Sequence, residues 1–405
     1  MNANWAYKWV QIMAHNKSIL SVCWALLSLF ALYGLTMVNF TPLLSDLGLL
    51  IISLALMSVV MGYLIDSFKS GLVQLALSLY ILLMLFGGMG WIGTPFNTES
   101  VLGLVVVVTL LTSNLVHILS TLLREMARGL FQYDAMAEAL KSNAMPIFLS
   151  NLTTALGFIF AAWFDASLTE LAIIVSLGAA ISFLSAMTWL PLFLLSWLLE
   201  FRVGNSADRH GFSFVSKGLM KYRWLRNGLL WLGIGLLVVL TVFNGLYQPQ
   251  FQDLFWLGVA FFVLFLIFWQ SLKLALINVL VNLLALMITL NIFMLFMALG
   301  NMSLLLIMVP LGLIVDDGIH FFSRYVRAQQ SVFTDAESAV RFSMASVGRP
   351  IWISSWVLFI GLAVLAFSQN ELVQLASLIT LLALFIATFL ILLVVPAILI
   401  SLQNK

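Results

Sequence analysis

The chain has 405 residues, of which 63% are hydrophobic and only 8% are charged, and its formal net charge is +2. Soluble globular domains carry about 25% charged residues, so this composition excludes a soluble fold and indicates an integral membrane protein. The single cysteine, Cys23, excludes an internal disulfide framework and leaves the redox compartment undefined. An amphipathic N-terminus precedes a spanning apolar run, so we expect no cleavable signal peptide.

Apolar runs long enough to cross about 30 Å of hydrocarbon predict twelve membrane helices. The first six are Ile19–Val38, Leu47–Ile65, Leu72–Ile92, Val101–Leu122, Pro146–Phe164 and Leu171–Leu198. The last six are Asn227–Leu246, Leu254–Gln270, Leu272–Leu299, Ser303–Arg324, Pro350–Phe367 and Leu372–Leu402. The fold class predicted from the sequence is therefore an all-α polytopic membrane protein.

The basic residues predict the orientation of these helices. With both termini in the cytoplasm, every lysine and arginine falls in an inner connection, at a terminus or at the inner membrane boundary, as the positive-inside rule requires. The outer connections carry only acidic charges, at Asp46, Glu99, Asp165, Glu170, Asp253 and Glu371. These outer connections are short, so we expect no soluble domain on that side.

The two groups of six helices are related in sequence. The segment LLTSNLVHILSTLLREM (Leu110–Met126) aligns with LIVDDGIHFFSRYVRAQ (Leu313–Gln329). His117 then corresponds to His320, while Ser113 and Asn114 correspond to Asp316 and Asp317. Further along, Pro146 pairs with Pro350 and Pro191 with Pro396, at offsets of about 203 to 205 residues.

Both copies have the same predicted orientation, because six helices separate them. We therefore predict a first six-helix repeat at 1–199, a cytoplasmic linker at 200–226 and a second six-helix repeat at 227–405. Parallel repeats of this kind are common among membrane transporters.

The tenth predicted helix carries two adjacent carboxylates and a histidine within the stretch Pro310–Tyr325. An acidic side chain at the bilayer centre costs about 2.5–3.5 kcal/mol on insertion scales, so a functional role is the default interpretation. At about 100° per residue, one sector of this helix holds all the polar groups: Asp316, Asp317, His320, Ser323 and Arg324.

Three interpretations of Asp316 and Asp317 are open: a structural polar cluster, a Na⁺ site and a proton relay. Two carboxylates without a membrane lysine repel each other, so the pair takes up a proton as a unit. His320 lies one helical turn after Asp316 and can form a hydrogen bond with it. We therefore favour a proton relay of Asp316, Asp317 and His320.

The matching stretch of the fourth helix is neutral, and we expect it to form the facing wall of the same site. The predicted polar lining is His117, Ser113, Asn114, Ser323, Arg324, Ser354 and Ser355, with Asn151, Thr153 and Thr154 as weaker candidates. The plainer interpretation is interhelical hydrogen bonding for the polar residues and interface anchoring for Arg324. Asn278, Asn282 and Asn291 of the ninth helix are assigned to helix packing.

No motif indicates an enzyme: the chain has no H-E-x-x-H, no Gly-rich phosphate loop and no Cys/His metal set. We expect no enzymatic activity, no cofactor and no metal, and a proton or Na⁺ as the coupling ion. A metal held by His117, His320 and the aspartates is a less favoured alternative. We expect no nucleic-acid binding, because the topology accounts for the basic residues.

The pattern G-x-x-V-D-x-x-I-H-x-x-S-R-Y over Gly312–Tyr325, followed by G-R-P-I at 348–351, resembles the resistance–nodulation–division (RND) superfamily. It is most similar to the MMPL branch of lipid and hydrophobe exporters. The resemblance implies a bacterial inner-membrane protein whose carboxylates on the fourth and tenth helices form a proton relay that drives export. This chain departs from the family by lacking large periplasmic domains, and by carrying Ser113 and Asn114 where acidic residues are expected.

We therefore expect a compact transporter of lipid or another hydrophobic substrate, coupled to the proton-motive force. In this scheme, protonation of the aspartates removes charge between the two halves and lets them repack. The alternative is an energy-transducing or scaffolding subunit that works with a separate periplasmic-domain-bearing or membrane partner. A sterol-sensing-like lipid receptor is a weaker alternative, and the sequence leaves oligomerisation open.

Overall fold

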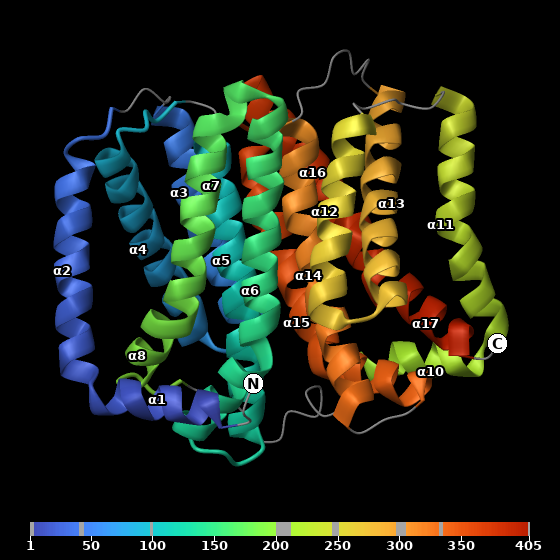
Figure 1. The fold of residues 1–405 in the computed structure, drawn as a ribbon, viewed down its shortest axis with the longest axis horizontal. Helices are drawn as coiled ribbons and strands as arrows, with labels where there is room; N and C mark the ends of the chain where they lie inside the picture. Colours follow the sequence, from blue (N-terminus) through green and yellow to red (C-terminus); the bar gives the residue numbers. More distant parts are fainter. Residues whose placement is uncertain are drawn as a thin grey trace. The chain divides into compact units, whose positions relative to one another are not determined.

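The computed structural model describes residues 4–39, 44–97, 100–199, 212–244, 251–296, 305–331 and 335–403 (Figure 1). These residues are almost entirely helical and contain no β-strand. Ten of the described helices are long and apolar enough to cross a membrane. The predicted all-α polytopic membrane fold is thus confirmed, while the count of twelve spans and the orientation stay predictions. Residues 200–211 of the predicted linker, and parts of the loops after the first and seventh predicted helices, lie outside the described residues.

The chain forms two compact units, and the first consists of residues 1–205 together with 356–377. Its helices from the N-terminal part of the chain are α1 (Trp5–His15), α2 (Lys17–Leu35), α3 (Leu44–Ile65), α4 (Phe68–Ile92), α5 (Ser100–Ala127), α6 (Gln132–Phe164) and α7 (Thr169–Leu184). A π-helical turn, η2 (Ser185–Trp189), joins α7 to α8 (Leu190–Leu194).

The second unit consists of residues 206–355 together with 378–405. Its helices are α10 (Ser213–Lys221), α11 (Arg223–Asn244), α12 (Phe251–Trp269), α13 (Leu272–Phe296), α14 (Leu305–Ser331), α15 (Ala336–Leu365) and α16 (Glu371–Phe389). A second π-helical turn, η3 (Leu390–Val394), leads into α17 (Val395–Gln403). Because the units divide within α15 and α16, these two helices belong to both. The predicted division into two sequence repeats stays a prediction.

Burial differs widely among the candidate membrane helices and does not follow their hydropathy. The most apolar window of α5 is 100% buried and that of α14 is 94% buried, whereas that of α2 is only 11% buried. The window of α14 is nevertheless the least apolar of the ten. The two stretches singled out in the sequence therefore lie on the two most enclosed of the candidate membrane helices.

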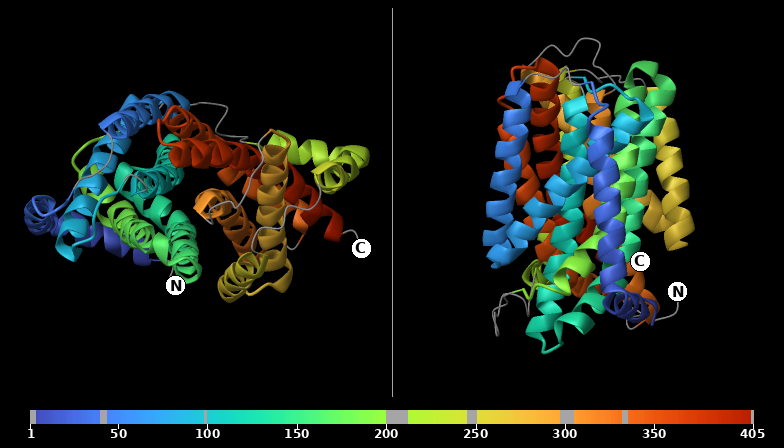
Figure 2. Two further views of the ribbon diagram at one scale, coloured as in Figure 1. Left: turned by 90° about the horizontal axis from the view of Figure 1, so that it is seen from above. Right: turned by 90° about the vertical axis from the view of Figure 1, so that its left-hand side faces the viewer.

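The short helix α1 lies across the ends of the upright helices of unit 1 (Figures 1 and 2). Trp9 Nε1 donates to the Met187 carbonyl oxygen at 2.9 Å, and the Tyr7 hydroxyl donates to Glu138 Oε1 at 2.8 Å. Burial, reinforced by this carboxylate, raises the pKa of Tyr7 to about 12, so its hydroxyl keeps the proton. An amphipathic helix in this position suits the interface between headgroups and hydrocarbon.

Small residues let α2 and α4 approach backbone to backbone. A Cβ atom on Gly87 would overlap the backbone of Ala31, and one on Gly90 would overlap the carbonyl of Gly34. Beside this contact, Trp91 stacks on Phe30 with ring centroids 4.3 Å apart. The small residues of each helix are three positions apart here, and small residues at the interface are a recurrent means of packing membrane helices.

We predict that Gly87→Val displaces α2 from α4 and lowers the stability of unit 1 by about 1–3 kcal/mol, because the branched side chain overpacks the contact. Thermal unfolding in detergent measures the change. Gly48→Val on α3 is the matched control, since no atom lies within 4 Å of a Cβ at that position. Equal losses for the two variants would contradict the packing argument.

Candidate functional site

The carboxylates and the histidine predicted on the tenth helix lie in the middle of α14, where all three are buried. Their exposed fractions are 5% for Asp316, 3% for Asp317 and 0% for His320. His320 Nε2 lies 3.6 Å from Asp316 Oδ1, one helical turn away. The expected stacking of His320 on Asp316 is therefore present, at a distance slightly beyond that of a hydrogen bond.

Asp317 is held by two hydroxyl groups from two other helices. Its Oδ2 accepts from Ser355 Oγ of α15 at 3.3 Å and from Thr388 Oγ1 of α16 at 3.1 Å. The two hydroxyl oxygens are themselves 2.8 Å apart. Asp317, Ser355 and Thr388, here named the second triad, thus join α14, α15 and α16 through one carboxylate.

The Ser355 hydroxyl lies within hydrogen-bond distance of three oxygen atoms. Its Oγ lies 2.7 Å from the carbonyl oxygen of Ile351, one turn earlier in α15, in addition to Asp317 and Thr388. A serine hydroxyl has a single proton and can therefore donate to only one acceptor at a time. The carboxylate thus competes with the helix backbone for the Ser355 proton.

The ninth-helix asparagines reach the same site from α13. A Cβ atom on Gly318, the residue after Asp317, would overlap Oδ1 of Asn278, so the Asn278 side chain of α13 lies directly against the backbone of α14 there. Asn282 Nδ2 donates to the Asn278 carbonyl oxygen at 2.8 Å and to Asn278 Oδ1 at 3.2 Å. Asn278 therefore packs α13 against Gly318, the residue next to Asp317 on α14.

Three further predicted lining residues make contacts of their own. Ser323 Oγ accepts from Trp269 Nε1 of α12 at 3.3 Å, and Ser354 Oγ donates to the Ile351 carbonyl oxygen at 2.9 Å. Arg324 is 5% exposed and lies two turns after Asp317 on α14. Ser355, another of the serines predicted to line the site, reaches the Asp317 carboxylate of the pair.

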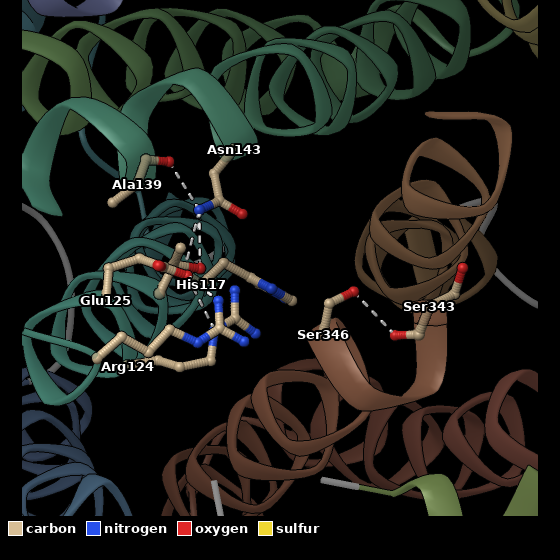
Figure 3. A network of polar contacts seen from close by, with 9 residues as sticks. His117, Arg124, Glu125, Ala139, Asn143, Ser343 and Ser346 are labelled. Carbon is tan, nitrogen blue, oxygen red and sulfur yellow. Dashed lines mark hydrogen bonds and ion pairs between the residues drawn. The ribbon is translucent and has the colours of Figure 1, made fainter. Parts of the chain in front are cut away.

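In unit 1, the stretch around His117 lies on α5 and is fixed to α6 (Figure 3). The His117 carbonyl oxygen accepts from Thr121 Oγ1 at 2.8 Å and from Asn143 Nδ2 at 3.3 Å. Asn143 Nδ2 also donates to the Ala139 carbonyl oxygen at 2.9 Å. The His117 side chain is completely buried. That this stretch forms the facing wall of a shared site stays a prediction.

The neutral counterpart of Asp317 makes a comparable contact in unit 1. Asn114 Nδ2 of α5 donates to Ser182 Oγ of α7 at 3.1 Å. On α6, Asn151 Nδ2 donates to the Ile147 carbonyl oxygen at 2.7 Å, as its sequence counterpart Ser355 does to Ile351. Asn114, Asn151 and Ser182 are here named the first triad.

The backbone repeats these features as well. The π-helical turn η2 begins at Ser185, and η3 begins at Leu390, the same 205 residues later that separate Pro191 from Pro396. Each π-helical turn follows closely on the hydroxyl of its triad, Ser182 in α7 and Thr388 in α16. These two hydroxyls differ by one position in the repeat alignment. π-Helical turns are rare and occur often at functional sites.

Thr388 is a site residue that the sequence did not single out. It is one of several hydroxyl residues in an otherwise apolar helix, together with Ser377 and Thr380, and nothing in the sequence distinguishes the one that meets a carboxylate. Asn278 could be noticed in the sequence, because an amide within a membrane span predicts a contact with another helix. The sequence did not show that this contact is with Gly318.

The donor set can hold a small cation as well as a proton. In the second triad, one carboxylate and two hydroxyls bring oxygen atoms together, and oxygen donors suit hard cations. Within unit 2, Asp316 and His320 offer one oxygen and one nitrogen close together, fewer than the four ligands typical of a structural zinc site. The identity of the coupling ion, and the expectation of no metal, stay predictions.

Comparisons with solved structures show which fold this is. The structure is similar to that of SecDF in its super-membrane-facing form, with a TM-score of 0.70, 12% sequence identity, and coverage of 89% of this chain and 62% of that one. It is also similar to SecDF from Thermus thermophilus, described as a translocon-associated membrane protein, with a TM-score of 0.67, 14% identity, and coverage of 89% and 63%.

The chain therefore spans less than two thirds of the length of these proteins. No protein-family model matches the sequence, and no curated protein matches it either. At this level of identity the likeness concerns the fold alone. Membership of the RND superfamily and of its MMPL branch stays a prediction.

We predict that Thr388→Val lowers stability at alkaline pH, where Asp317 is ionised, by about 1.5–3 kcal/mol, because the isosteric change removes a hydrogen bond to a charged group. The loss should shrink in acid, where a protonated carboxyl group needs the donor less. Thermal unfolding in detergent as a function of pH measures both effects. Ser377→Ala is the control, a buried hydroxyl on the same helix; a loss for Thr388→Val that is independent of pH would contradict the prediction.

Proposed function

We propose that the chain is an RND-type, MMPL-like transporter of the bacterial inner membrane that couples proton movement to transport of a lipid or another hydrophobic molecule. Asp316, Asp317 and His320 take up and release the proton. The observation that carries the proposal is the buried Asp317 carboxylate, which two hydroxyls from α15 and α16 hold in place. We propose no enzymatic activity for it.

Hydroxyl partners suit a carboxyl group that changes its protonation state. A hydroxyl donates to the ionised form and accepts from the protonated form, so both states of Asp317 can be satisfied in place. When Asp317 is protonated, Ser355 is free to return its own proton to the Ile351 carbonyl oxygen at 2.7 Å. Protonation therefore weakens the hold of α15 on α14 without leaving a buried polar group unpaired.

Asp316 and His320 supply a second proton-binding position on the same helix. The 3.6 Å between His320 Nε2 and Asp316 Oδ1 is short enough for a proton to pass after a small movement. The two carboxylates are adjacent in sequence and point about 100° apart around the helix. In the proposed relay, a proton moves from Asp316 to Asp317 along α14, as it does along the carboxylate and histidine chains of proton pumps.

The two helices that hold Asp317 provide the coupling to unit 1. Beyond Ser355, α15 continues into unit 1, where the Gly361 carbonyl oxygen accepts from Ser53 Oγ of α3 at 2.8 Å. At the segment between α15 and α16, Ser368 Oγ donates to Asp46 Oδ1 at 2.7 Å. A displacement of α15 on protonation of Asp317 is thereby transmitted to α3 along a continuous helix.

The substrate class rests on two supports. The first is the resemblance of the Gly312–Tyr325 pattern to the lipid and hydrophobe exporters of the MMPL branch. The second is an apolar groove of about 570 Å³ on unit 1, whose size suits an acyl chain or a comparable hydrophobic group. The groove is lined by Ile159, Ala162, Thr169, Ala172, Ile173, Ser176 and Leu177.

The test reconstitutes the purified chain in liposomes that contain a pH-sensitive dye, and imposes a pH gradient with and without a Na⁺ gradient. Wild-type protein should carry protons, and the double variant Asp316→Asn, Asp317→Asn should fall to the level of empty liposomes. Glu371→Gln, an exposed acidic residue at the start of α16, is the control and should behave as wild type. Transport that depends on Na⁺ alone, or that survives the double variant, would overturn the proposed proton coupling.

A second candidate function is an energy-transducing subunit that acts on a separate partner. It is favoured by the likeness to SecDF, a protein described as translocon-associated, of which this chain spans about 63% of the length. Purification from its native membrane in mild detergent distinguishes the two functions. The subunit hypothesis expects a partner protein at a fixed ratio, and substrate transport by the isolated chain in liposomes would argue against it.

A further inference from the structure

We propose that the first triad is a proton-insensitive copy of the second, in which Asn114 stands permanently in the place of a protonated Asp317. Only Asp317 of the second repeat then takes up and releases a proton, and Asn114 of the first repeat keeps the same hydrogen bond throughout. The inference rests on the proposed proton coupling and adds to it a role for Asn114, as the counterpart of Asp317 that does not bind a proton. It follows from two recurring contacts: a side-chain bond links the fourth and sixth helices of each repeat, and the matching residue of the fifth helix donates to the backbone one turn earlier.

The strongest correspondence is between the two links that connect the fourth and sixth helices of each repeat. In unit 1 the link is Asn114 Nδ2 to Ser182 Oγ at 3.1 Å, and in unit 2 it is Thr388 Oγ1 to Asp317 Oδ2 at 3.1 Å. Each link lies just before a π-helical turn, Ser185–Trp189 in one case and Leu390–Val394 in the other. A π-helical turn is costly and rare, so its recurrence marks the two places as equivalent.

The chemistry of the amide explains why it can stand for the protonated acid. A carboxamide has the shape of a carboxylic acid, carries no charge, and offers donors on one side and an acceptor on the other. Asn114 is therefore locked as a donor to Ser182 Oγ, as a protonated Asp317 would be to Thr388 Oγ1. Because the Ser182 hydroxyl could equally donate, the pocket is able to accept an ionised carboxylate at position 114.

The charges around Asn114 leave it without a built-in counterion. On α5 itself the nearest titratable side chain is His117, one turn later. On the helices that pack against α5, charged groups lie towards the ends, as at Asp46 of α3, Lys69 of α4, Glu138 and Lys141 of α6 and Glu170 of α7, while Tyr80 lies halfway along α4. Asn114 itself carries no ionisable proton, which supports a passive role for the first triad.

The test transfers the carboxyl group from one repeat to the other. Asp317→Asn should abolish proton uptake in the liposome assay, and Asn114→Asp added to it should restore uptake above that background. Infrared difference spectra on acidification should show the carboxyl band lost with Asp317→Asn and a new one gained with Asn114→Asp. Gln74→Glu is the matched control, because Gln74 is also a buried amide bonded to hydroxyls but its repeat counterpart is Asn278.

The outcomes separate the inference from the function it rests on. Absence of proton uptake by the wild type would contradict the proposed function. A wild type that takes up protons, together with no recovery by Asn114→Asp or equal recovery by Gln74→Glu, would overturn the equivalence of the triads.

A second pair of variants keeps the inference testable if an aspartate at 114 prevents folding. Ser182→Ala and Thr388→Ala each remove the hydroxyl of one triad. We expect Ser182→Ala to lower thermal stability and to leave the pH midpoint of proton uptake unchanged, whereas Thr388→Ala changes that midpoint. A midpoint that changes equally in both variants would show that the first triad also titrates, and would overturn the proposal.

Discussion

The structure depends on one buried carboxylate that is shared among three helices. Asp317 is buried in the middle of a candidate membrane helix, where a charge is costly, and two hydroxyls from α15 and α16 offset that cost. The same hydroxyls can reverse their bonds when the group is protonated. A buried carboxyl group without a partner stays protonated, because its charge is not stabilised. One that is paired with an arginine stays ionised. A hydroxyl pair leaves both protonation states within reach, which is the property that proton coupling requires.

The sequence predicted the fold class and the central residues because both follow from the cost of placing polar groups in lipid. Composition alone indicates a membrane protein, and Asp316, Asp317 and His320 stand out because almost every neighbouring residue is apolar. The partner helices do not follow from the same reasoning. Thr388 became a site residue only through the packing of α16 on α14, and Asn278 only through the missing side chain of Gly318. Both depend on tertiary contacts between segments far apart in the chain, which the polarity of a single helix does not encode.

The internal repeat was predicted from prolines and histidines. The sequence did not reveal which hydrogen bonds recur at the repeat-related positions. The sequence alignment pairs Asn114 with Asp317 and suggests only that one copy lost its charge. The structure adds that the neighbouring bonds, Asn151 to Ile147 and Ser355 to Ile351, also recur. It further shows that the π-helical turns recur in register with the prolines. The repeat thus preserves a local architecture while the ionisable group at its centre differs.

The way α15 and α16 are shared between the compact units has a consequence for biosynthesis. Residues 356–377 belong to unit 1, yet they are made only after residues 206–355 of unit 2. Proteins are made from the N-terminus onwards, and a unit packs fully only when all of its segments are present. The N-terminal helices of unit 1 therefore complete their packing only after most of unit 2 has been synthesised.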